Sequence, residues 1–326
     1  MNTRINNIHD KFVKELLANR EVAIAFLSEF LPPELVTLFD FDTLIYEPTS
    51  YLNTDLSDFF SDMVWRVDVR GEVEVKISIL LEHKSYRDNR TSFQVLEYMA
   101  LGYLAQLKSG EKVSLIIPLV YYHGHEQWEY QPLSSFFEDL NPIFKRYLPV
   151  HATEFVSLLA LSNAQIEQLT MGLLQNALFI QKNYRDGGYL LSQIEKILGR
   201  LNPYLQNTSF RSIFVYLIQN ENIDNQELRT KLVTLPTKLS DAMMSLYDEL
   251  IQEGIEKGIN LGMEKGINLG IEKGINLGME KGMDNTKIDV ILKAYDNHLG
   301  ISTIQMLTDL NEARILEILR EHGRIS

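Results

Sequence analysis

The chain has no cysteine among its 326 residues. Disulfide bonds, thiolate catalysis and cysteine-based zinc sites are therefore excluded, and a reducing cytoplasm is the expected location. No apolar run approaches the roughly 18 residues of a membrane-spanning helix, so no membrane association is expected. The polar start MNTRINNIHDKF also lacks the apolar stretch of a secretory signal.

Positive charge is scarce, with 31 Lys and Arg against 44 Asp and Glu and a net charge of −13. Because attraction to phosphates needs clustered Lys and Arg, this balance argues against nonspecific adhesion to nucleic acid. It leaves open a local basic groove or a phosphate bridged by a metal. The chain also lacks G-x-G-x-x-G, Walker, G-x-S-x-G and H-E-x-x-H motifs, which removes the commonest nucleotide, hydrolase and zinc-protease assignments.

The spacing of apolar residues predicts a mixed α/β core with a helical C-terminal extension. The composition, 45% hydrophobic and 23% charged, is that of a globular protein. Helical patterns dominate from Asn163 to about Leu250. Before them we predict, in order, one helix from His9 to Leu31, two strands within 61–85, a helix over 91–107, a strand buried on both faces over 113–124 and a short strand at 154–160.

The two strands within 61–85 form a predicted β-hairpin. Odd positions in both are apolar and even positions are mostly polar. If the turn centres on Glu72, the residue numbers of each cross-strand pair add up to 144, so odd-numbered residues lie opposite odd-numbered ones. The apolar faces of the two strands then coincide, and a shift of one residue would separate them. Asp62 then lies opposite Glu82, and Lys84, two residues on, points to the same face.

This arrangement predicts a metal site. Two carboxylates this close repel each other unless a cation lies between them or one takes up a proton. A hard divalent ion, Mg²⁺ or another such as Mn²⁺ or Ca²⁺, relieves the conflict and can bridge to a phosphate. Lys84 would orient an attacking water or stabilise developing negative charge. The alternative is an ordinary surface pair of Glu82 and Lys84 at a strand end.

The same residues resemble the D…(D/E)-x-K signature of the PD-(D/E)XK nuclease superfamily. The words HDKFVKELL, FLPPEL, SDMVWRV, LLEHKS and PLVYYHG, in this order, resemble the Rpn recombination-promoting nucleases, also called YhgA-like transposases. The resemblance covers residues 9 to about 160 well and continues more loosely to about 250. Many relatives carry glutamine at the position of Lys84, and the lysine is closer to the active superfamily pattern.

The resemblance implies a PD-(D/E)XK (restriction-endonuclease-like) core and metal-dependent hydrolysis of phosphodiester bonds in DNA, with a role in recombination. Asp62 and Glu82 would be metal ligands and Lys84 the water-orienting base or electrophile. Glu15 resembles an additional acidic residue that some members use. The alternative is a catalytically inactive nuclease-fold scaffold that assembles partners through its helical tail.

Other side chains are weaker candidates. Lys11, Lys14, Arg87 and Arg90, with Lys84, would form a basic rim that contacts DNA, although ordinary solvation at the protein surface is the default explanation for them. His83 lies on the apolar face of its strand, which favours a structural role. His123 and His125 have the spacing of a metal pair, and the exit of a strand into a loop explains that spacing equally well.

Residues 254–283 carry glycine at every fourth position and the sequence EKGINLG three times. Ile or Met follows each glycine, which makes an apolar stripe that drifts slowly around a helix. Eight interior glycines cost roughly 1 kcal/mol each relative to alanine, so such a helix needs a packing partner. We expect it to form a homodimer with a second copy; the alternative is a flexible spacer.

Four domains are expected from these patterns. The last would be an interaction hairpin of two short helices within 301–322, preceded by a helix over about 285–298; a DNA-reading helix-turn-helix is the alternative, but the charge there is near balance. The predicted domains are a PD-(D/E)XK core over 1–160, a helical extension over 161–250, the helical glycine repeat over 251–283 and the C-terminal helical hairpin over 284–326.

Overall fold

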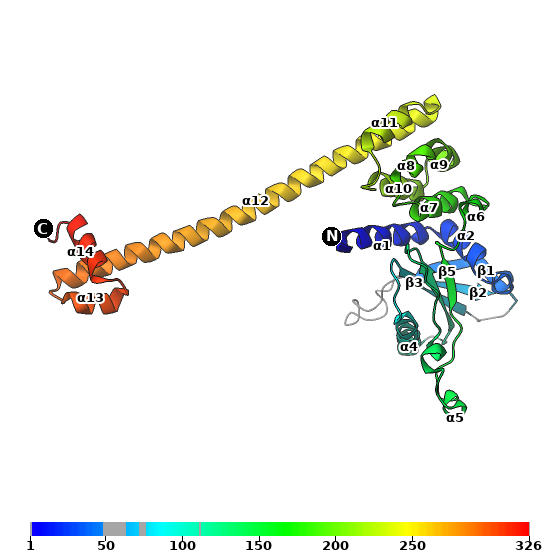
Figure 1. Ribbon diagram of the computed structural model, residues 1–326, viewed down its shortest axis with the longest axis horizontal. Coiled ribbons are helices and arrows are strands. Elements are labelled where there is room, and N and C mark those ends of the chain that lie inside the picture. Colours follow the sequence, from blue (N-terminus) through cyan, green and yellow to red (C-terminus); the bar gives the residue numbers. More distant parts are fainter. Residues whose placement is uncertain (1, 48–62, 72–75, 111, 326) are drawn as a thin grey trace. The chain divides into compact units, whose positions relative to one another are not determined.

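The computed structural model describes residues 2–47, 63–71, 76–110 and 112–325. The chain divides into two compact units, Met1–Leu246 and Tyr247–Ser326. The first unit contains a five-stranded sheet and many helices, so the predicted mixed α/β class is confirmed (Figure 1). In the described part of the chain, no helix is both long enough and apolar enough to cross a membrane.

The N-terminal region forms two helices where the sequence pattern predicted one. Helix α1 (Asn2–Ala18) ends just before Asn19, and α2 (Arg20–Phe30) begins after it. Asn19 is extended, and its side-chain oxygen accepts from the backbone N–H groups of Glu21 and Val22. As the N-cap of α2, Asn19 thus satisfies two backbone N–H groups that the break between the helices leaves without helical partners. Helix α3 (Pro33–Leu38) follows, with proline at its start.

The sheet has the strand order β1-β2-β3-β4-β5. Strands β1, β2 and β3 are antiparallel neighbours, whereas β4 runs parallel to β3 and β5 parallel to β4. Helix α4 (Thr91–Ser109) connects the parallel pair β3 and β4, as such a connection requires. The strands are β1 (Phe39–Glu47), β2 (Met63–Val69), β3 (Lys76–Lys84), β4 (Leu115–Tyr122) and β5 (Glu154–Ser157).

The hairpin register is the predicted one. Met63 pairs with Leu81 and Asp68 with Lys76, so each described pair sums to 144. Gly71, in the turn, has φ of 75°, a left-handed conformation that favours glycine. Asp62 lies outside the described residues, so its place opposite Glu82 stays a prediction. Strand β1 was not predicted; its register shifts between Asp40 and Ile45, which breaks a simple alternation.

Helices cover both faces of the sheet (Figure 1). On one face α4 packs Val95, Tyr98 and Met99 against Ile116 and Val120, even-numbered residues of β4. On the other face Tyr121, an odd-numbered residue of β4, packs edge-on against Phe26 of α2, with 5.4 Å between the ring centroids. Strand β4 is therefore buried on both sides, as its apolar sequence predicted.

Further helical elements of the first unit follow β4 along the chain, and two of them, α7 and α10, pack against α2 and α1, respectively. Phe12 of α1 stacks on Tyr216 of α10 with 3.8 Å between ring centroids. These elements are η2 (Leu133–Phe137), α5 (Pro142–Lys145), α6 (Asn163–Glu167), α7 (Gly172–Lys182), α8 (Gly187–Ser192), α9 (Ile194–Leu201), η3 (Asn202–Tyr204), α10 (Thr208–Ile218) and α11 (Asn225–Val233).

Helix α12 (Thr237–Asp296) has 60 residues and contains the whole glycine repeat. Its C-terminal part packs with α13 (Ile301–Thr308) and α14 (Glu312–Glu321), the two short helices predicted within 301–322. Their cluster includes Ile291 of α12, Ile304 of α13 and Ile315 of α14. The second unit thus has a small apolar core of its own.

Candidate active site

Lys84 is the last residue of β3, and its side chain is buried, with 7% of the side-chain surface exposed. Its ammonium donates a 2.7 Å hydrogen bond to Oε1 of Gln94 on α4. It also forms an ion pair with Asp88 at 3.5 Å. The even-numbered face of the strand is therefore the face toward α4, and Lys84 is held there by two defined partners.

Asp88 is a site residue that the sequence analysis missed. Its side chain is 5% exposed, and its Oδ1 accepts from the backbone N–H of Arg90 at 2.9 Å. Burial raises the pKa of this carboxyl, but the Arg90 N–H and the Lys84 ammonium outweigh burial, so the pKa lies below its usual value. The available signal in the sequence was an aspartate three residues before the start of a predicted helix, where its side chain can close a turn.

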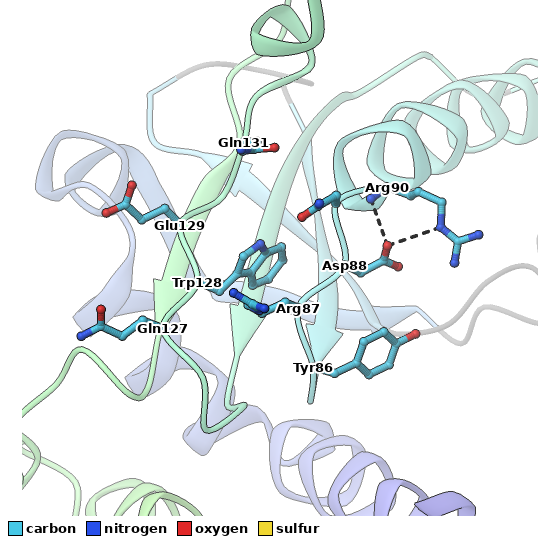
Figure 2. Close-up of a pocket in the computed structure, with 9 residues that line it drawn as sticks. Tyr86, Arg87, Asp88, Arg90, Gln127, Trp128, Glu129 and Gln131 are labelled. Carbon is cyan, nitrogen blue, oxygen red and sulfur yellow. Dashed lines mark hydrogen bonds and ion pairs between the residues drawn. The ribbon is translucent and has the colours of Figure 1, made fainter.

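An open groove of about 720 Å³ lies beside this ion pair (Figure 2). The segment Tyr86–Arg90, between β3 and α4, lines one side. Four residues that follow β4 line the other: Gln127, Trp128, Glu129 and Gln131. Tyr86 is 54% exposed, whereas Trp128 packs edge-on against Tyr122 and Phe155. Asp88 both lines the groove and pairs with Lys84. The aromatic and polar side chains of the groove are therefore connected to that lysine by a single residue.

Both arginines of the predicted basic rim lie at this groove. Arg87 pairs with Glu126 at 2.7 Å, and Arg90, whose side chain is 80% exposed, pairs with Asp88 at 3.4 Å. Each guanidinium has five N–H donors, so these pairs leave capacity for a phosphate. The structure therefore groups Arg87 and Arg90 with Asp88 and, through it, with Lys84.

The candidates on α1 form their own surface pairs. Lys11 pairs with Glu15 at 3.6 Å, and Lys14 pairs with Asp10 at 3.1 Å. All four side chains are more than a third exposed, and such i,i+4 pairs are typical of solvated helix surfaces. The DNA contacts expected of Lys11 and Lys14 and the catalytic role expected of Glu15 stay predictions.

The side chains of the two predicted metal ligands, Asp62 and Glu82, lie outside the described part of the chain. Asp62 lies outside the described residues, and of Glu82 only the backbone, in β3, is described. The same holds for His83. Within the described ranges no three His, Asp or Glu side chains are grouped so that they could hold a metal ion. Among these described side chains, His123 and His125 are not part of such a group.

Comparison with known proteins places the chain in a family. The family model described as "Putative transposase, YhgA-like" matches residues 7–209. The chain is 27% identical over 258 residues to recombination-promoting nuclease RpnA of Escherichia coli K12, which covers 76% of this chain and 84% of RpnA. It is 26% identical over 254 residues to inactive recombination-promoting nuclease-like protein RpnE of the same strain, covering 77% and 83% of the two chains.

A third relative is recombination-promoting nuclease RpnC of Escherichia coli K12, at 24% identity over 251 residues, 76% of this chain and 82% of RpnC. No solved structure matches the chain significantly. The family match covers more than half of the sequence and includes the sheet, α4 and the candidate site. The chain therefore belongs to the YhgA-like transposase family, whose relatives named here include both nucleases and an inactive nuclease-like protein.

Proposed function

We propose that this protein is a metal-dependent endonuclease that hydrolyses phosphodiester bonds in DNA, on a PD-(D/E)XK core. The observation that carries the proposal is the register of β2 and β3. From Asp68–Lys76 to Met63–Leu81, the residue numbers of each pair add up to 144. Continued by one pair, it would set Asp62 opposite Glu82. The order of helix, antiparallel strands, α4 and parallel β4 supports the same core.

In this proposal Asp62 and Glu82 hold a divalent cation, Mg²⁺ by preference, because two adjacent carboxylates need a charge between them. When bound, the ion supplies a bound water of lowered pKa and neutralises charge on the phosphate.

Lys84, on the face toward α4, orients the attacking water or stabilises the developing negative charge. Gln94 and Asp88 position its ammonium. Arg87 and Arg90 contact phosphates along the groove.

A nicking assay on supercoiled plasmid, with and without Mg²⁺ or Mn²⁺, tests the proposal. Asp62→Ala and Glu82→Ala should each abolish metal-dependent nicking, because each removes one proposed ligand. In metal-free buffer both variants should be as stable as the unaltered protein or more so, since each removes a repulsive partner. Undiminished nicking by either variant would show that the site is elsewhere.

A second candidate is an inactive nuclease-fold scaffold that assembles partners. The observation that favours it is the burial of Lys84, whose charge is paired with Asp88 rather than displayed to solvent. The similarity to RpnE, named as inactive, points the same way. Absence of nicking with either metal, combined with unaltered folding, would support this candidate over the enzyme.

A further inference from the structure

A second cavity lies at the carboxyl ends of the three parallel strands. Ser85 follows β3, His123 follows β4 and Leu158 follows β5, and all three line it. In open α/β sheets this edge is the usual place for ligands. The volume of about 130 Å³ suits a small anion with a few waters, since one water occupies roughly 30 Å³ in the liquid. We call it the histidine pocket.

The histidine pocket collects nitrogen donors from distant parts of the chain. His9 comes from α1, His123 and His125 follow β4, and Lys182 and Arg185 come from the end of α7 and the segment after it. The rings of His9 and His123 are 5.3 Å apart. None of the described residues that line the pocket is Asp or Glu. The described lining therefore carries net positive charge, from Lys182 and Arg185, although the chain as a whole is acidic.

A buried amide is left without a partner here. Gln181 is 4% exposed, and its Oε1 accepts a 2.6 Å hydrogen bond from the hydroxyl of Tyr121. Its Nε2 has no hydrogen-bond partner among the described residues. An unsatisfied buried donor is unfavourable, and a ligand oxygen that accepts from it would remove that cost.

Two neighbouring groups fit the same ligand. The ammonium of Lys182 donates to the backbone oxygens of Leu158, Leu159 and Leu161, so it adds charge to the pocket while its own donors are engaged. Nδ1 of His9 lies 2.5 Å from the hydroxyl of Tyr216. Burial raises the pKa of Tyr216, so this hydroxyl keeps its proton. When this hydroxyl donates to Nδ1, the imidazole proton of His9 is on Nε2.

We propose that the histidine pocket binds a phosphate group, with Gln181 Nε2 and the imidazoles of His9 and His123 as donors. Its identification as a phosphate rather than another oxyanion rests on the proposed function, because a nucleic-acid strand at Lys84 brings phosphates close to Ser85, the next residue. The source is either a phosphate of that strand or free inorganic phosphate.

The test is titration of the metal-free, full-length protein with inorganic phosphate at constant ionic strength, followed by phosphorus NMR line width and by thermal melting. Binding should be saturable and should raise the melting temperature relative to chloride at matched ionic strength. The absence of saturable binding would overturn the proposal. No cleavage is measured, so a chain that binds phosphate without nicking DNA would sink only the proposed function.

Gln181→Glu is the sharpest variant, because it keeps an acceptor for Tyr121 and replaces the Nε2 donor by a carboxylate oxygen. We expect the dissociation constant for phosphate to rise at least tenfold. Lys231→Ala, on α11, makes the same change in net charge outside the pocket and should leave binding unaltered. If Gln181→Glu does not fold, His123→Phe removes a donor while keeping a ring. Wild-type affinity in either folded variant would contradict the assignment.

Competition identifies the source of the phosphate. Displacement of bound phosphate by a duplex with 5′-hydroxyl ends supports a backbone phosphodiester as the occupant. Displacement only by a 5′-phosphorylated duplex supports a terminal phosphate. Saturable phosphate binding that neither duplex displaces supports free phosphate as the ligand.

Discussion

Lys84 and Asp88 form a buried ion pair at the end of β3, where the proposed function also gives Lys84 a catalytic role. Both side chains are nearly inaccessible, at 7% and 5% exposure. A buried ion pair gains little overall against apolar residues of the same size, but loss of one partner leaves the other charge uncompensated. In the proposed catalytic role, Lys84 would therefore depend on Asp88, four residues later in the segment before α4, to keep its ammonium in place.

Replacement of Lys84 separates these two roles. Lys84→Ala should lower the free energy of unfolding by about 3 kcal/mol, because Asp88 loses its countercharge inside the protein. The double variant Lys84→Met with Asp88→Leu should lose less, since neither charge remains. Urea unfolding measures both. Equal losses in the single and double variants would mean that the ion pair has no structural role.

The same replacement tests the division of catalytic roles. In the Lys84→Ala protein, turnover should fall much more than metal affinity, because the ammonium is assigned to water and phosphate rather than to the ion. A large loss of metal affinity with normal turnover at saturating metal would reverse that assignment.

The lowered pKa of Asp88 predicts that the stability of the fold depends on pH. Its folded pKa lies below the ordinary value of 3.8, so the folded state binds this proton less tightly than the unfolded state. The pair therefore stabilises the fold above pH 3.8 and loses that contribution as the pH falls below it. The difference in unfolding free energy between the unaltered protein and Asp88→Asn should be constant above about pH 5 and shrink in acid.

Urea unfolding at several pH values measures this difference. Asp88→Asn keeps the shape of the side chain and its acceptor for the Arg90 N–H, so it removes mainly the charge. A difference that stays the same well below pH 3.8 would mean that the carboxylate charge is not what stabilises this site.

Among the elements, α12 poses the clearest physical problem. Its eight repeat glycines cost roughly 8 kcal/mol relative to alanine, yet the segment is helical. Apolar side chains of the repeat are more than half exposed, from 51% for Ile255 to 62% for Met279. No described atom lies within 4 Å of the Cβ position at any of these glycines apart from their own helix and chain neighbours. A closely packed second helix would fill this space.

We predict that the repeat pairs with that of a second copy. Burial of four or five apolar side chains at about 1.5–3 kcal/mol each would offset the glycine cost. Light scattering should find a dimer for the full chain and a monomer for a chain truncated after Leu250. Deletion of residues 256–263, one repeat unit, should leave the dimer intact because the pattern is preserved.

Replacement of Gly266 and Gly274 by leucine distinguishes pairing from a spacer. Both substitutions raise helix propensity, and a Cβ at either position has no described atom within 4 Å other than its chain neighbours and nearby helix backbone. They should nevertheless weaken the dimer, since they hold the two backbones apart. Equal oligomeric states for the full and truncated chains would mean that the repeat does not join two copies.

At the scale of the whole molecule, the chain has two units with separate apolar cores. The first is built on the sheet and its helices, and the second on the cluster of α12, α13 and α14. Separate cores favour separate unfolding transitions. Calorimetry should therefore show two transitions, of which a chain truncated after Leu250 keeps the larger. A single cooperative transition of the full chain would show that the units are energetically coupled.

The sequence by itself determined the mixed α/β class, helix α4, the buried strand β4 and the register of the hairpin. The reason is local periodicity. Alternation with period two assigns each residue of β2 and β3 to a face, and a shift by one residue would bury polar side chains, so only one register satisfies both strands. Lys84 could therefore be placed on the even-numbered face before the structure was known.

Only the tertiary structure decided which groups surround Lys84. Asp88 and Gln94 lie in a turn and a helix, where no periodic pattern says that their side chains face the end of β3. The rings of His9, on α1, and His123, just after β4, meet because the tertiary fold brings α1 to the end of that strand. Such pairings between distant segments depend on how helices and sheet pack together, since the residues of each segment carry no local trace of their partners.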